Sequence, residues 1–69
     1  MGYFSISTRK LDDIGRYSRC LEKNEIRYHM DADRVSSHTI QYNFFMYCTQ
    51  EAFETVLKEL RIKMKEVNT

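Results

Sequence analysis

Two histidines and two aspartates near the middle of the chain could do chemistry: His29, Asp31, Asp33 and His38. Imidazole and carboxylate groups bind metal ions and transfer protons, and alternation along a strand would place His29 and Asp31 on one face. A catalytic metal site usually needs three protein ligands with ordered residues around them, and these four match no recognised spacing. Asp and Ser also collect in turns, where they hydrogen-bond the backbone. The pattern therefore favours an ordinary turn over a metal site or an acid–base pair.

The two cysteines, Cys20 and Cys48, could pair or act as nucleophiles. A thiol nucleophile needs a histidine within hydrogen-bond reach and an oxyanion hole, and the sequence indicates neither. Both cysteines fall where buried thiols behave as small hydrophobic groups, near a helix end and on a core face. Two cysteines are also too few for a secreted disulfide scaffold, which favours a reducing cytoplasm. We therefore expect a cytoplasmic protein that is not an enzyme and needs no cofactor or metal.

Residues 39–48 have the most informative pattern in the chain. A mostly apolar set that includes Phe44 and Met46 alternates with a set that begins polar and ends in Phe45 and Tyr47. Strict alternation indicates a strand whose two sets of side chains point to opposite faces of a sheet. Because both sets end in apolar residues, the second face must be covered inside the fold or by a partner.

Composition bounds the size and class of the protein. The chain has 69 residues, of which 42% are hydrophobic, 30% charged and 13% aromatic, with two Gly and no Pro. These values predict one small ordered domain over residues 1–69, built mostly from regular elements. A domain of this size buries only about 60% of the surface of its unfolded chain, so its core is small. The formal net charge of +1 gives no overall attraction to nucleic acid or to an anionic membrane.

The first half of the chain predicts a strand and a helix. Residues 3–7 alternate and form the strand, and Ser7 or Thr8 supplies the helix cap. The helix covers residues 9–23 and ends at Asn24, which tolerates the left-handed conformation. One stripe of its apolar residues has helical spacing and should face the sheet. The stripe consists of Leu11, Ile14, Tyr17 and Leu21.

The second half predicts a hairpin and a second helix. Alternation from Ile26 indicates a second strand, and the polar residues 31–37 indicate the hairpin loop before the strand at 39–48. Thr49 caps the final helix, whose apolar stripe runs over four turns. The stripe consists of Phe53, Val56, Leu57, Leu60, Met64 and Val67.

The element order is thus β-α-β-β-α. A right-handed crossover makes the first two strands parallel, and the third strand fits between them, antiparallel to both. The expected fold is α+β and two-layered, a three-stranded mixed sheet of order 1-3-2 with both helices on one face. This layout resembles a ferredoxin-like fold without its fourth strand.

The sheet face away from the helices is the candidate functional surface. It would gather Tyr3, Ser5, Arg27, His29, Gln41, Asn43, Phe45 and Tyr47. Tyr, Phe and Arg are enriched at protein interfaces, which predicts a partner-binding site made by Tyr3, Arg27, His29, Phe45 and Tyr47. The partner would be another protein or a second copy of the chain.

The sequence leaves two alternatives to a protein interface open. Aromatic rings beside Arg and His also stack on bases and contact phosphates, so a small RNA-binding or single-strand-binding protein is the main alternative. A terminus folded over the same face would be a simple detail of the fold. The first strand, if it lies at an edge, is either a second binding site, to which a strand of a partner or of a second copy can add, or an ordinary solvated edge.

The sequence therefore predicts a non-catalytic module that modulates or inhibits a larger cytosolic protein. Stand-alone proteins of this size are common among phage-encoded modifiers of host or defence enzymes, anti-CRISPR proteins included. That analogy is one of size alone.

Overall fold

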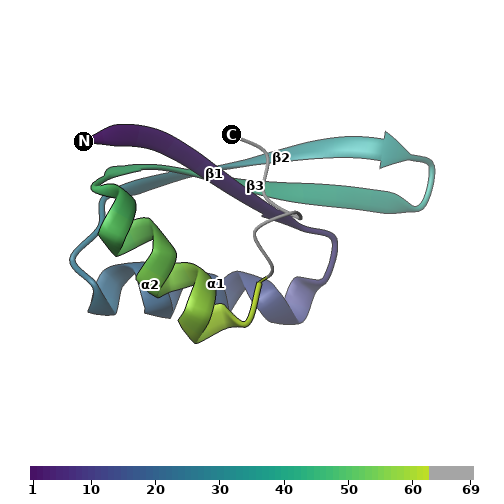
Figure 1. Cartoon of the computed structure of the whole chain (residues 1–69). Helices are drawn as coiled ribbons and strands as arrows, with labels where there is room; N and C mark the ends of the chain where they lie inside the picture. The colour runs from purple at the N-terminus through teal and green to yellow at the C-terminus, as the bar shows by residue number, and fades with distance from the viewer. Residues whose placement is uncertain (63–69) are drawn as a thin grey trace.

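The computed structural model of the chain describes residues 1–62, which form a sheet and two helices (Figure 1). The elements follow in the predicted order. They are β1 (Gly2–Thr8), α1 (Leu11–Lys23), β2 (Tyr28–Ser36), β3 (Thr39–Cys48) and α2 (Gln50–Leu60). Both helices lie on one side of the sheet, which confirms the predicted two-layer α+β arrangement. No helix in residues 1–62 is long and apolar enough to cross a membrane.

The strand order is β1-β3-β2, which confirms that β3 is central and puts β1 at an edge. β3 pairs antiparallel with both neighbours, with Tyr47 opposite Tyr3 and Phe45 opposite His29. This pairing was predicted, whereas the description of the sheet as mixed is wrong. β1 and β2 do run in the same direction, but they lie on opposite sides of β3 and share no hydrogen bonds.

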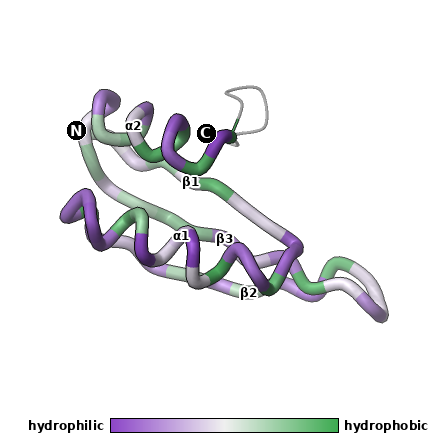
Figure 2. Tube along the Cα trace, turned by 90° about the horizontal axis from the view of Figure 1, so that it is seen from below, coloured by the Kyte–Doolittle hydropathy of each residue, from purple (hydrophilic) through white to green (hydrophobic). Residues whose placement is uncertain are grey.

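The core lies between the sheet and the helices. Phe44 from β3, Phe53 and Val56 from α2, and Leu21 from α1 are fully buried. The rings of Phe4 and Phe53 stack with their centroids 4.3 Å apart, which joins β1 to α2. Figure 2 shows α2 alongside β1 and α1 beneath the other two strands, with the tip of the β2–β3 hairpin beyond both helices.

The hairpin differs from its prediction at both ends of β2. The strand begins at Tyr28 rather than Ile26 and continues to Ser36, so residues 31–36 are not a loop. The turn itself comprises only residues 37–38. The polar residues of β2 favour a turn locally, but each can pair with the long β3 while its side chain stays in water. Backbone pairing therefore outweighs local turn propensity.

The start of α1 also differs from its prediction. Thr8 remains in β1, and the residue that precedes the helix, Lys10, provides no capping side chain. The Thr8 hydroxyl instead accepts a hydrogen bond from the Lys10 amide at 3.1 Å and donates to the Asp13 carboxylate at 2.6 Å. Leu11 is 73% exposed, so the buried stripe of α1 begins after it.

Both helices end in the same way, without glycine. In each, a left-handed residue is followed by an isoleucine: Glu25 (φ 57°) by Ile26, and Arg61 (φ 59°) by Ile62. Each isoleucine amide donates to the carbonyl five residues earlier at 2.9 Å, which is the Schellman arrangement. Asn24 is the C-cap as predicted, although Glu25 adopts the left-handed conformation in its place.

α2 begins as predicted and is shorter than predicted. The Thr49 hydroxyl accepts the Ala52 amide at 3.1 Å, which confirms the cap. The helix ends at Leu60 because Arg61 adopts the left-handed conformation. Met64 and Val67, which the sequence assigned to the helix, lie outside the described residues.

Candidate protein-binding face

The face of the sheet opposite the helices, here called the outer face, has two chemically different halves. The register places Tyr3 opposite Tyr47, and Ser5 and His29 on either side of Phe45. These five residues, with Arg27 just before β2, form the aromatic half. The polar half follows along the strands, and it consists of Ser7, Asp31, Asp33, Gln41 and Asn43. All five residues predicted as the binding site thus lie in the aromatic half.

The aromatic half exposes large rings to solvent. Tyr3 is 84% exposed, Phe45 45% and Tyr47 46%. The Tyr3 and Tyr47 rings pack against each other across the β1–β3 pair, with their centroids 4.6 Å apart and their planes at 49°. Because the rings are attached to strands of one sheet, their positions are fixed by backbone pairing rather than by a loop.

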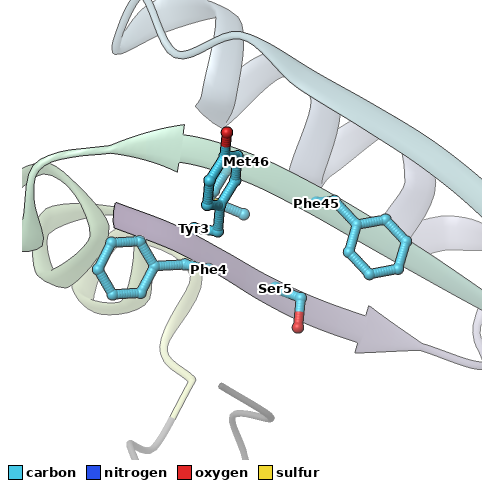
Figure 3. A pocket seen from close by; sticks show the side chains of 5 residues that line it. All are labelled: Tyr3, Phe4, Ser5, Phe45 and Met46. Carbon is cyan, nitrogen blue, oxygen red and sulfur yellow. The ribbon is translucent and has the colours of Figure 1, made fainter. Parts of the chain in front are cut away.

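Two shallow hollows lie between these rings. One, of about 240 Å³, has Tyr3 and Phe45 on its two sides and Ser5 between them along β1 (Figure 3). Met46 and Phe4 complete its lining. The other, of about 260 Å³, lies towards β2. It is lined by Tyr3, Arg27, Tyr28, His29, Phe45, Met46 and Tyr47. The small Ser5 side chain opens the first hollow, a feature that alternation in the sequence does not reveal.

Arg27 and His29 line the second hollow, and both are exposed. Within residues 1–62, neither side chain makes a hydrogen bond or an ion pair. The aromatic half therefore presents donors of hydrogen bonds that have no acceptor in the described part of the protein.

In the polar half, by contrast, the side chains hydrogen-bond to one another. Asn43 is buried at its centre, although it points to the outer face. Its side-chain oxygen accepts from Ser7 at 2.7 Å and Gln41 at 2.9 Å, and its amide donates to Asp33 at 2.9 Å. This network was not predicted, because the polar residue type of Asn43 suggested exposure. A network with its hydrogen bonds already made gains little from a partner.

The four residues that first suggested acid–base or metal chemistry are not gathered into a site. Asp31 accepts the amide of Ala32, Asp33 belongs to the Asn43 network, and His38 lies in the hairpin turn. Across residues 1–62, no group of three or more His, Cys, Asp or Glu side chains could hold a metal ion.

The two cysteines are free and buried. Burial raises the pKa of Cys20 to about 11, and the carboxylate of Glu59, which accepts a hydrogen bond from the thiol at 3.1 Å, contributes to the rise. Burial also raises the pKa of Cys48. Both groups are therefore thiols rather than thiolates at neutral pH, and the thiolate is the nucleophilic form.

Comparisons of the chain with protein-family models, curated proteins and solved structures gave no match.

Proposed function

We propose that this protein is a non-catalytic binding module whose aromatic half docks onto another protein and so modulates or inhibits a larger protein of the cytoplasm. One observation carries the proposal. Three exposed rings stand beside the exposed side chains of Arg27 and His29, which have no partner in residues 1–62, while the polar half forms its own hydrogen-bond network around Asn43.

The residue types suit a protein interface. Tyr and Arg are among the residues that dominate binding energy, and they act best where a partner removes them from water. The exposed parts of Tyr3, Phe45 and Tyr47 would each gain about 25 cal/mol per Å² of apolar surface buried. A rigid sheet also loses little conformational entropy on binding, which leaves more of that gain as affinity.

Charge on the same face favours a protein over a nucleic acid. Asp31 and Asp33 follow His29 along β2 and point to the same face, about 7 Å and about 13 Å further along the strand. A nucleic acid strand that stacked on the rings and continued towards Asp31 and Asp33 would bring its phosphates close to their carboxylates. A protein partner can instead place one acidic group beside Arg27 and leave Asp31 and Asp33 uncovered.

The experiment is a selection of random linear peptides, displayed as a library, on the immobilised protein. We expect enriched peptides that lose binding to the double variant Phe45→Ala/Tyr47→Ala. The matched control is Leu11→Ala/Ile40→Ala, which removes two exposed apolar side chains outside the outer face and should bind as the wild type does.

Equal binding by the folded Phe45→Ala/Tyr47→Ala variant would contradict the proposal. So would tighter binding of single-stranded oligo(U) than of any selected peptide, with an affinity that falls steeply as salt rises. Light scattering of the free protein adds a third check. The expected mass is that of the 8.4 kDa monomer, whereas a dimer that Phe45→Ala/Tyr47→Ala dissociates would show a second copy on this face.

A further inference from the structure

We infer that the partner segment contains a large apolar residue next to an acidic one. The apolar side chain enters the hollow over Ser5, and the carboxylate accepts hydrogen bonds from Arg27 and His29. This inference rests on the proposed function and names the chemistry that the same face recognises.

The hollow over Ser5 would bind the apolar side chain of the partner. Its sides are the rings of Tyr3 and Phe45, and Met46 contributes to its lining. A closed apolar cavity of about 150 Å³ holds a benzene ring, so an open hollow of about 240 Å³ has room for one aromatic or large aliphatic side chain. Ser5 is the position that keeps this space open, because it is the one small residue in the lining.

Arg27 provides the positive charge, and His29 provides a further N–H donor beside it. They line the second hollow, which shares Tyr3, Phe45 and Met46 with the first, so the two sites are adjacent. The other ionic groups on the outer face already have partners. Arg9 donates to Gln41 at 3.3 Å, Asp31 accepts from the Ala32 amide, and Asp33 accepts from Asn43. An incoming carboxylate would therefore meet donors that it does not have to share, and charge-assisted hydrogen bonds of this kind are among the strong ones.

Two pairs of variants test the hollow over Ser5 and the charge of Arg27 separately, with the peptides that were selected on the wild type. Ser5→Leu fills the hollow, while Ser5→Ala leaves it open. Arg27→Glu reverses the charge at the rim, while Arg19→Glu reverses an exposed charge on α1, in the helix layer. Thermal unfolding of each variant shows whether the fold is retained.

We expect selected peptides to carry Asp or Glu next to a large apolar residue. Ser5→Leu and Arg27→Glu should each weaken their binding about tenfold or more, and Ser5→Ala and Arg19→Glu should bind within about twofold of the wild type. Peptides without acidic residues, or unchanged binding to folded Ser5→Leu, would overturn the inference. If such peptides still lost binding to Phe45→Ala/Tyr47→Ala, the proposed function would stand and only the stated partner chemistry would fail.

Discussion

The rings of Tyr3 and Tyr47 pack against each other on the outside of the sheet, 4.6 Å apart between centroids, although one is 84% and the other 46% exposed. The pair joins the edge strand to the central strand at the end of the sheet where the two hollows lie. Its contact fixes the ring positions that shape those hollows, so the pair connects the stability of β1 with the proposed binding function.

A double-mutant cycle on this pair should show coupling. We expect Tyr3→Ala and Tyr47→Ala together to destabilise the fold less than the sum of the two single changes, by about 0.5 to 1 kcal/mol, because each single variant already removes the ring contact. Urea unfolding of the four proteins measures this difference. Strictly additive changes would show that the rings lie together without stabilising each other.

Truncation of the two adjacent phenylalanines on β3 should destabilise the fold to very different extents. Phe44 is fully buried, so Phe44→Ala should cost about 3 to 5 kcal/mol, comparable with the whole stability of a domain of this size. Phe45 points to the outer face, and Phe45→Ala should cost about 1 kcal/mol or less while the fold is kept. Circular dichroism during urea unfolding distinguishes the two. Loss of the fold in Phe45→Ala would contradict the assignment of the faces.

The carboxylate of Asp13 should make stability depend on pH. A hydrogen bond from the Thr8 hydroxyl is the largest cause that lowers the pKa of Asp13 below its ordinary value of 3.8, and Arg16 lowers it further. Folding thus favours the charged form, and its stabilising effect is complete above about pH 4 and lost as pH falls through the lowered pKa. Asp13→Asn should therefore be less stable than the wild type at neutral pH, and the difference should shrink below about pH 4.

Unfolding by urea at a series of pH values measures this convergence. The matched control is Asp12→Asn, which changes an exposed neighbouring carboxylate. A difference between Asp13→Asn and the wild type that stayed constant into acid would show that the charge of Asp13 contributes nothing.

Gly15 should be replaceable with a gain in stability. It lies within α1 and is exposed, and a Cβ added there would meet only the guanidinium of Arg19 at 3.2 Å. That group is the far end of a flexible side chain and can move. Gly15→Ala should therefore stabilise the protein by about 0.5 to 1 kcal/mol and raise Tm by about 2 to 8 °C. A lower Tm by differential scanning calorimetry would contradict this expectation.

Much of the fold could be predicted because the apolar patterns are regular. Alternation in β3 placed Phe44 and Met46 in the core and Phe45 and Tyr47 outside, as the structure confirms. The helix ends were harder to predict, because Glu25 and Arg61 adopt left-handed conformations that are usually occupied by glycine. The extent of β2 was missed because nearly all of its residues are exposed, so its sequence does not alternate between apolar and polar residues.

The candidate site could be predicted only in part. Topology and alternation together bring Tyr3, Arg27, His29, Phe45 and Tyr47 to one end of one face, which is where the structure places them. The hollow over Ser5 depends on the side-chain shapes of two paired strands, and the burial of Asn43 depends on three hydrogen bonds from different strands. Neither can be inferred from the spacing of residues along one strand.

The most direct test of the central claim is an NMR map of amide chemical-shift changes when a selected peptide is added to the wild-type protein. The account predicts changes confined to β1, the start of β2 and the second half of β3, centred on Ser5 and Phe45. Changes centred instead on α1 and α2, around Arg19 and Glu59, would contradict it, because the partner would then bind the helix layer and not the outer face.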